Sequence, residues 1–336
     1  MHNYASQVPL RRSLRTSTHS EGGEHMKRVF IDGSSGTTGL RIADRLSRRD
    51  DISLIRLPEE QRKDSSARRD AMNRADIAFL CLPDDAAREA VSFLENPSTV
   101  IIDTSTAHRT ADGWTYGFPE LRGQRDRLRT SRLIANPGCH ASGFIALIAP
   151  LTAFGALKPD ALLTCFSLTG YSGGGKKMIA GYEEDGRDSL LDAPRQYALG
   201  QSHKHLPEMK KICGLDHAPV FSPIVAPFYA GMEVTVPLHA SQLAIPFRSL
   251  PEVYAEYYAG EGAVRCVSAA DEGGFLSAGA YAGRDDMEIA VCGNEERILL
   301  VSRFDNLGKG ASGAAIQNMN IRLGLPEDTG LIWRKP

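Results

Sequence analysis

Several features that mark a special environment or partner are scarce in this chain of 336 residues. The six cysteines lie far apart without a C-x-x-C pair, which is not the pattern of a disulfide framework or a zinc knuckle. No run approaches the roughly 20 apolar residues that span a bilayer. The 39 basic and 41 acidic residues are spread evenly, which argues against a nucleic-acid groove. We therefore expect a cytoplasmic protein that handles small molecules, with neither membrane nor nucleic acid among its partners.

The length exceeds the roughly 100 to 200 residues of one domain, so two domains are expected. Residues 1–25 are rich in Arg, Ser and Thr. We interpret them as a disordered extension or as a start assigned too far upstream, with an organelle-targeting segment as the alternative. We then expect a dinucleotide-binding domain over 26–138, a catalytic and oligomerisation domain over 139–304, and a C-terminal helix over 305–330 that returns to the first domain.

Short apolar strands alternate with helix-length segments in the first half of the chain. RVFID is followed by the glycine-rich GSSGTTG and the helix-like LRIADRLSRR, and further apolar runs occupy 52–57, 76–82 and 99–103. This alternation is typical of a doubly wound parallel sheet. After residue 150 the strands become longer and more amphipathic, as in PVFSPIVAPF and MEVTVPLHA. The expected fold class is α/β: a Rossmann-like parallel sheet plus a second, mixed α+β domain.

The glycine-rich turn is the candidate cofactor site. It follows the first expected strand and opens a helix, so its backbone N–H groups and the helix N-terminus can approach a pyrophosphate. The spacing is G-x-x-G-x-x-G instead of the commoner G-x-G-x-x-G, so the context matters more than the motif. The expected contacts are Gly33, Ser34, Ser35, Gly36, Thr37, Thr38 and Gly39.

Cationic residues follow the second expected strand. NAD sites usually carry an acidic residue there to hold the ribose 2′-hydroxyl. This chain has Arg56 and then Arg62, which favour a 2′-phosphate, although Glu59 and Glu60 leave NAD open. We expect NADP.

Cys139 is the candidate nucleophile. It follows an Asn-Pro-Gly turn and begins an apolar helix, so the helix dipole and free amides should stabilise its thiolate and an oxyanion. The alternative is a buried cysteine that acts as a small hydrophobe, which fits Cys81, Cys165 and Cys292 inside strand-like runs. The adjacent His140 is not expected to be the base, because neighbouring side chains diverge at a helix start.

The segment HKHLPE is a candidate source of the general base. His203 and His205 precede Pro207, which favours a helix start, and Glu208 falls in the first helical turn. Histidine titrates near neutrality without adjustment. A metal site built from both histidines and the carboxylate, or two solvated histidines, are the alternatives. We expect no metal.

Several motifs together resemble one family. They are NPGC with the following Gly143, GYSGGGK, YGFPEL, HKHLPE and DNLGKGASGAAIQNMN. Over about residues 26–330 the chain resembles the short-type N-acetyl-gamma-glutamyl-phosphate reductases of arginine biosynthesis, related to aspartate-semialdehyde dehydrogenases. It departs from the family's usual Tyr and Thr at His140 and Ser142.

The resemblance implies an NADPH-dependent reduction of an acyl phosphate through a thioester on Cys139. It makes His205 the preferred base, with His203 second and Glu208 as an orienting carboxylate. For the departing phosphate it implies Arg109, and from the residues themselves we add Ser105 as a hydroxyl donor and Lys176 as an alternative cation. The implied cofactor contacts also include Gly173, Gly174, Asn306, Lys309 and Gly310.

Two alternatives stay open at this stage. The same chemistry could act on another acyl phosphate, because fold and thiol do not fix the acyl group. A cofactor-binding regulator that has lost turnover is the second, against which the intact Cys139, His205 and Arg109 argue. Strands in the second domain also predict a homo-oligomer, either a dimer or a tetramer.

Overall fold

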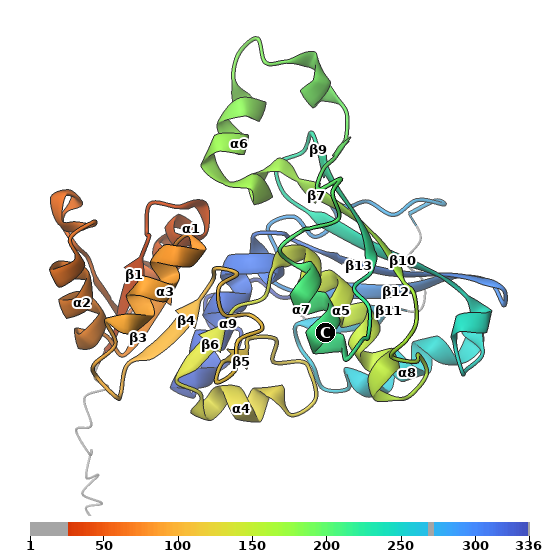
Figure 1. The fold of residues 1–336 in the computed structure, drawn as a ribbon, viewed down its shortest axis with the longest axis horizontal. Coiled ribbons are helices and arrows are strands. Elements are labelled where there is room, and N and C mark those ends of the chain that lie inside the picture. The colour runs from red at the N-terminus through yellow and green to blue at the C-terminus, as the bar shows by residue number, and fades with distance from the viewer. Residues whose placement is uncertain (1–25, 268–271, 335–336) are drawn as a thin grey trace, which may run out of the picture.

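Two β-sheets organise the chain, each with its own helices (Figure 1). The computed structural model describes residues 26–267 and 272–334. The expected disordered extension over residues 1–25 lies outside the described residues. Within the described ranges, no helix is both long and apolar enough to cross a membrane.

The first sheet is parallel, with the strand order β2-β1-β3-β4-β6-β5. Its central strands read as continuous apolar runs because helices cover both faces. The Rossmann-like sheet expected from the sequence is therefore confirmed. Its strands are β1 (Lys27–Asp32), β2 (Ile52–Ile55), β3 (Ile77–Leu80), β4 (Val100–Asp103), β5 (Thr115–Tyr116) and β6 (Leu133–Ala135).

Helices pack on both faces of this sheet in two separate cores. One core joins α1, α4 and the C-terminal α9 to the sheet, through residues such as Ile42, Leu128 and Ile316. The other joins α2 and α3, through Met72 and Ala90. The last helix of the chain thus packs against the first sheet. The helices are α1 (Thr37–Leu46), α2 (Ser65–Arg74), α3 (Asp84–Ser92), α4 (Gln124–Thr130) and α9 (Gly313–Leu323).

The second sheet is mixed, with the order β11-β12-β13-β10-β7-β9-β8. The β7–β9 and β11–β12 pairs are parallel and the other pairs antiparallel. This confirms the expected mixed second domain. The strands are β7 (Thr164–Gly170), β8 (Arg195–Gln196), β9 (Val220–Ala226), β10 (Met232–His239), β11 (Val264–Val267), β12 (Met287–Gly293) and β13 (Arg297–Phe304).

Helix α5 (Cys139–Ala153) forms the centre of the second core. It is apolar on all sides, and every residue from 140 to 151 is buried, as expected for a helix enclosed by other elements. It contacts β10, β13, α7 (Leu206–Cys213) and α8 (Leu250–Tyr257). Helix α6 (Gly175–Glu183) projects away from both sheets at the top of Figure 1. Short helical turns are η1 (Glu59–Gln61), η2 (Tyr171–Gly174), η3 (Ser189–Asp192), η4 (Ala240–Gln242), η5 (Phe247–Ser249) and the π-helical η6 (Gly308–Ser312).

Candidate active site

The glycine turn between β1 and α1 depends on the absence of side chains. Gly33 has φ +82°, and a Cβ there would lie 2.2 Å from the carbonyl oxygen of Cys81. A Cβ on Gly39 would lie 2.6 Å from the carbonyl oxygen of Gly33. Gly36 is the N-cap of α1 and offers no side-chain cap, so the first amides of the helix stay available. The Oγ1 of Thr37 is buried and has no partner among the described residues.

A cavity of about 500 Å³ opens in front of this turn. The turn contributes Gly36, Thr37, Thr38 and Gly39, and the ends of β3 and β4 contribute residues 81–85 and 104–106. This is the edge of a parallel sheet where dinucleotides bind. The uncapped helix start, the side-chain-free turn and the unpartnered hydroxyl fit a dinucleotide phosphate. Gly33, Ser34 and Ser35 form the turn behind this lining.

A second cavity of about 390 Å³ contains Cys139. It also contains Arg109, His203 and His205. The two cavities share five lining residues, so they adjoin, and a group bound at the glycine turn can extend to the cysteine. The shared residues are Thr38, Thr104, Gly173, Lys204 and Leu307.

Cys139 is the first residue of α5, as the Asn-Pro-Gly turn predicts, and its N-cap is Gly138 without a side-chain cap. Its side chain is partly exposed and lines the cavity, but the protein around it limits hydration. Burial therefore raises the pKa of the thiol to about 11, although Arg109 and the amide of His140 act in the opposite direction. In the free protein burial therefore outweighs the helix start, which was expected to stabilise the thiolate of Cys139.

Glu208 connects the elements around Cys139. Its carboxylate accepts from Arg109 Nη1 at 2.8 Å, from the Tyr116 hydroxyl at 2.8 Å and from the Gly138 amide at 3.1 Å. A Cβ on Gly138 would lie 2.4 Å from Arg109 Nη1, 2.5 Å from His205 Nε2 and 2.6 Å from Glu208 Oε1. Only glycine therefore lets these three side chains approach the start of α5.

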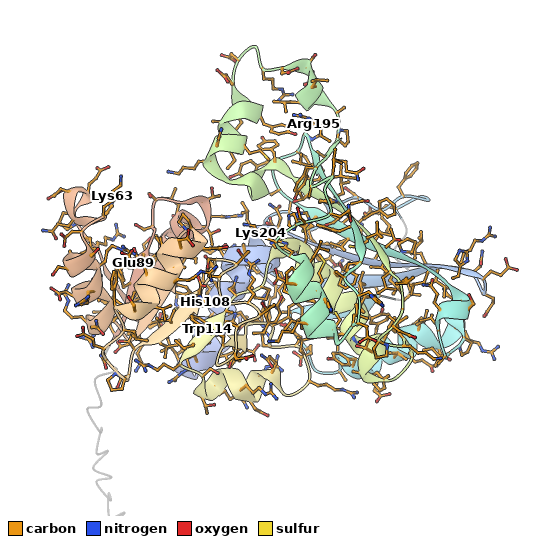
Figure 2. The ribbon with its side chains drawn as sticks, in the orientation of Figure 1. Lys63, Glu89, His108, Trp114, Arg195 and Lys204 are labelled. Carbon is orange, nitrogen blue, oxygen red and sulfur yellow. The ribbon has the colours of Figure 1, made fainter. Side chains whose placement is uncertain are left out.

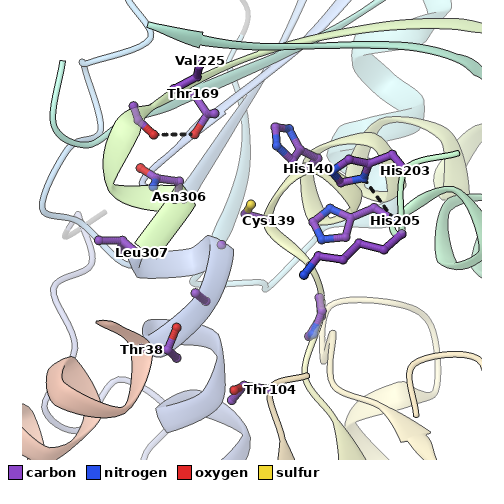
Figure 3. A pocket seen from close by; sticks show the side chains of 18 of the residues that line it. Thr38, Thr104, Cys139, His140, Thr169, His203, His205, Val225, Asn306 and Leu307 are labelled. Atoms are coloured by element: carbon purple, nitrogen blue, oxygen red, sulfur yellow. Dashed lines mark hydrogen bonds between the residues drawn. The ribbon is translucent and has the colours of Figure 1, made fainter. Parts of the chain in front are cut away.

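His205 is buried and reaches the same cluster, with Nε2 4.0 Å from Glu208 Oε1. Burial first, and then the Arg109 cation, lower its pKa well below the usual range. The ring is therefore neutral at physiological pH, and its Nδ1 has no partner among the described residues. His203 Nδ1 accepts from the His205 backbone N–H at 3.1 Å. Figure 3 shows both rings, with His140, gathered on one side of Cys139.

Arg109 lies in the cavity, but its charge is already paired. Besides the bond to Glu208, its Nε donates to the Asn136 carbonyl at 3.0 Å and its Nη2 to the Thr104 carbonyl at 3.1 Å. The expected role as the main phosphate cation is weakened, because Glu208 neutralises the guanidinium. Arg109 is better placed to hold the start of α5 and the β4 loop together.

Ser105 and Lys176 do not join Cys139. The Ser105 hydroxyl donates to Asp103 at 2.8 Å, and the residue lines the cofactor cavity only. Lys176 is exposed on α6 and lines neither cavity. These positions correct the expectation of direct phosphate contacts beside Cys139, because the Ser105 hydroxyl is bonded to Asp103 and the Lys176 side chain lies on the exposed side of α6.

Lys309 corrects a cofactor expectation. Its Nζ is buried and donates to Glu120 Oε1 and Oε2 at 2.7 and 2.8 Å and to Gln317 at 2.7 Å. All of the hydrogen bonds of the ammonium therefore go to buried protein groups, and Lys309 lines neither cavity. Asn306 and Gly310 do line the Cys139 cavity, as do Gly173 and Gly174. Arg56 and Arg62 are exposed after β2.

Lys204 was missed by the sequence reasoning, although it stands between the two candidate histidines. It lines both cavities and is exposed where the two halves of the molecule meet (Figure 2). No described carboxylate lies within ion-pair distance of its ammonium. The pKa of His203 is lowered to about 4, mainly by burial and next by the charge of Lys204. The charge of Lys204 therefore lowers the pKa values of both His203 and Cys139.

No group of three or more His, Cys, Asp or Glu among residues 26–267 and 272–334 is arranged to hold a metal ion.

Comparisons with known proteins identify the class. The family described as semialdehyde dehydrogenase, NAD binding domain, matches residues 28–130, and semialdehyde dehydrogenase, dimerisation domain, matches 139–306. An aspartate semialdehyde dehydrogenase II from Vibrio cholerae, complexed with ASA, has a similar fold. Its TM-score is 0.68 at 16% identity, over 89% of this chain and 99% of that chain. The Candida albicans aspartate semialdehyde dehydrogenase with NADP gives a TM-score of 0.61 at 15% identity, over 88% and 98%. The chain therefore has the semialdehyde dehydrogenase fold and domain pair.

Curated relatives narrow the class further. A protein of Trichormus variabilis is 45% identical over 318 residues, which cover 90% of this chain and 99% of the relative. A protein of Brucella ovis is 48% identical over 307 residues, which cover 88% and 99%. Both are named N-acetyl-gamma-glutamyl-phosphate reductase. The chain belongs to the N-acetyl-gamma-glutamyl-phosphate reductases, a family of oxidoreductases within the semialdehyde dehydrogenases, as the motifs predicted.

Proposed function

We propose that this chain reduces N-acetyl-gamma-glutamyl phosphate to N-acetylglutamate semialdehyde with NADPH and releases phosphate. The observation that carries the proposal is the cavity around Cys139, which adjoins the glycine-turn cavity. It contains a neutral histidine and a cation, Lys204, that has no carboxylate partner within the part of the chain that the structure describes. Curated relatives at 45–48% identity carry the name of this reaction. A nucleophile, a proton acceptor and an anion site within reach of a dinucleotide are the parts that reductive acyl transfer needs.

The first step is attack by sulfur. The raised pKa of Cys139, about 11, means that its thiol must lose a proton as it attacks the acyl carbon. The neutral imidazole of His205 accepts that proton. A carbon–sulfur bond forms, the carbon–oxygen bond to phosphate breaks, the departing phosphate takes up a proton from solvent, and an enzyme thioester results. Glu208 faces the ring of His205 and stabilises the imidazolium that forms.

Lys204 receives the departing phosphate in this proposal. Its ammonium has no carboxylate partner among the described residues and lies where the two cavities meet. A free ammonium forms a charge-assisted hydrogen bond to phosphate, whereas the guanidinium of Arg109 is held by Glu208. Arg109 therefore contributes through the position of Glu208 and Gly138.

The second half of the reaction uses the start of α5. When bound, the nicotinamide cofactor supplies the hydride that brings the thioester carbon to the aldehyde level. Amides in the first turn of α5 stabilise the negative oxygen that then develops next to the Cys139 sulfur. The carbon–sulfur bond breaks, the aldehyde leaves, and the imidazolium of His205 returns its proton to the Cys139 thiolate.

The finer cofactor assignment is NADP. The turn residues Gly33 to Gly39 and the uncapped start of α1 form the phosphate-binding part of the site. Arg56 and Arg62 are exposed after β2 and can pair with a 2′-phosphate. Asn306 and Gly310 line the cavity beside Cys139, where the nicotinamide end of the cofactor would lie.

We propose a homo-oligomer through the outer face of the second sheet. Phe166, Val220 and Leu299 are 46%, 60% and 43% exposed on this face, while the inner face packs on α5. Register places Phe166 opposite Thr235, and Leu299 opposite Pro237, on the same side of β10. An exposed apolar face of this kind is typical of a subunit interface, and light scattering tests whether the protein is an oligomer.

A cytoplasmic location stays a prediction.

The decisive experiment is an assay of the purified protein with N-acetylglutamate semialdehyde, phosphate, and NADP or NAD, followed by absorbance of the reduced nicotinamide. We expect phosphate-dependent turnover, faster with NADP. Cys139→Ser should abolish turnover and retain cofactor binding, because only the nucleophile is lost. The matched control is Cys266→Ser on β11, which should turn over normally.

Two outcomes contradict the proposal. Substantial turnover by Cys139→Ser would rule out the covalent route. Faster turnover of aspartate semialdehyde than of N-acetylglutamate semialdehyde would assign another acyl phosphate to the same site.

A further inference from the structure

His140 is a buried histidine in the Cys139 cavity that the proposed mechanism does not use. Both of its ring nitrogens have partners: Nδ1 lies 2.6 Å from Ser167 Oγ, and Nε2 lies 2.7 Å from the Tyr197 hydroxyl. Its ring also meets that of His203 edge-on at 5.5 Å (Figure 3). A histidine whose two ring nitrogens are both hydrogen-bonded has no free nitrogen to take a proton from the substrate or from Cys139. Its contribution must therefore come through its neighbours.

Ser167 decides which way the hydrogen bonds run. Its side chain is fully buried on β7, and His140 is the one partner of its hydroxyl among the described residues. If His140 donated to Ser167, the serine proton would have no acceptor, which is costly in a buried site. Ser167 therefore donates to Nδ1, and the ring carries its proton on Nε2. That proton is donated to the oxygen of Tyr197.

This direction leaves the Tyr197 proton free for a ligand. Tyr197 is half-buried and lines the Cys139 cavity, but it does not line the cofactor cavity. Its oxygen accepts from His140, so its own proton has no described acceptor and can turn toward the cavity. Because Tyr197 lines the Cys139 cavity and not the cofactor cavity, its hydroxyl is available to a substrate bound beside Cys139.

The segment that carries Tyr197 is held in a strained shape. Ala198 and Gln201 have φ of 51° and 54°, a left-handed conformation that residues with a side chain rarely adopt. The Tyr197 amide donates to the Pro223 carbonyl at 3.1 Å. The Gln201 side chain donates to the Phe221 carbonyl at 2.8 Å and accepts from its amide at 2.9 Å. Tyr197 is therefore fixed before a ligand arrives.

We propose that His140 is a positioning residue that turns the Tyr197 hydroxyl proton into the cavity, where it is donated to an oxygen of the substrate's N-acetylated amino-acid end. The acceptor is the α-carboxylate or the acetamide carbonyl. The identity of this substrate rests on the function proposed above. Tyr197 then recognises the end of the substrate that does not react, while Lys204 receives the phosphate end.

The test compares Michaelis constants for N-acetylglutamate semialdehyde in the phosphate-dependent assay. Tyr197→Phe removes the donor and keeps the ring, so KM should rise about tenfold, the effect of one hydrogen bond. The value of kcat and the Kd for NADP should change less than about threefold. His140→Phe should raise KM by the same factor, and the double variant should be no worse than Tyr197→Phe, because both changes remove one interaction.

His140→Gln is the matched rescue. Its amide nitrogen can still donate to Tyr197, so KM should stay within about threefold of the unmodified protein. If His140 were only structural, His140→Phe would lower the melting temperature. It would not produce a rise in KM that matches Tyr197→Phe and that His140→Gln avoids. If His140→Phe does not fold, Tyr197→Phe and His140→Gln carry the test together.

Three results would overturn the inference. Tyr197→Phe could keep the original KM, which would show that Tyr197 donates no hydrogen bond to the substrate. The factors of Tyr197→Phe and His140→Phe could multiply, which means independent roles. His140→Gln could show the same high KM as Tyr197→Phe. Absence of turnover by the unmodified protein would instead contradict the proposed function, and the variants would then be compared on whichever acyl substrate it accepts.

Discussion

Alkylation by iodoacetamide measures the ionisation of Cys139 directly, because the thiolate reacts and the thiol does not. The pKa of about 11, against 9.0 for an ordinary thiol, gives the expected size of the effect. At pH 7 about one Cys139 in ten thousand is ionised, compared with about one in a hundred for the reference thiol. We expect alkylation about 100-fold slower than for an exposed thiol, rising tenfold per pH unit to about pH 10.

The measurement follows the Cys139 peptide by mass spectrometry between pH 6 and about pH 10, in the free protein. Variants of two residues show which neighbouring charges set the pKa of Cys139. Lys204→Met should shift it to higher pH, because the Lys204 cation lowers the pKa of Cys139, whereas Lys204→Arg keeps the charge and the profile. His205→Asn should leave it unchanged, because His205 is already neutral in the free protein.

One result would refute this reasoning. A rate that reaches a plateau below pH 8 would mean that Cys139 and His205 form an ion pair before substrate binds. The helix start and the imidazolium would then outweigh the burial that keeps the thiol protonated, and loss of the plateau in His205→Asn would locate the cause.

Two further substitutions test the charges around the site. Lys204→Met should raise the KM for phosphate about 10- to 100-fold, the effect of one charge-assisted hydrogen bond, and leave NADP binding within about threefold. Lys176→Met is the matched control, because Lys176 lines neither cavity, and equal effects of the two would contradict the assignment. Lys309→Met should destabilise the fold by about 3–5 kcal/mol in urea unfolding, because Glu120 stays buried without its partner. Adding Glu120→Gln should recover part of this loss, and unchanged stability of the single variant would contradict the role of the pair.

The sequence predicted the parts of the site that depend on local order. A strand, a glycine turn and a helix follow one another between residues 27 and 46, so the cofactor turn could be recognised from neighbouring residues. Cys139 was found in the same way, because an Asn-Pro-Gly turn before an apolar run predicts a helix start. The parallel first sheet and mixed second domain followed from strand periodicity and strand–helix alternation, and the family followed from motifs spread along the chain.

Contacts between distant segments were beyond such reasoning. Glu208 lies 70 positions from Gly138 and 99 from Arg109, and their convergence decides which cation stays free for phosphate. The motif around Lys309 predicts a cofactor contact, but Lys309 pairs with Glu120, which lies 189 positions away in the sequence.

Charge and proton positions were decided only by tertiary structure. A helix start alone predicts a thiolate at Cys139, but burial by several elements raises its pKa to about 11. The bonds of His140 to Ser167 and Tyr197 join residues 27 and 57 positions away. Local sequence determines which backbone shapes are available, whereas burial and pairing depend on which segments meet, and these set the chemistry of the site.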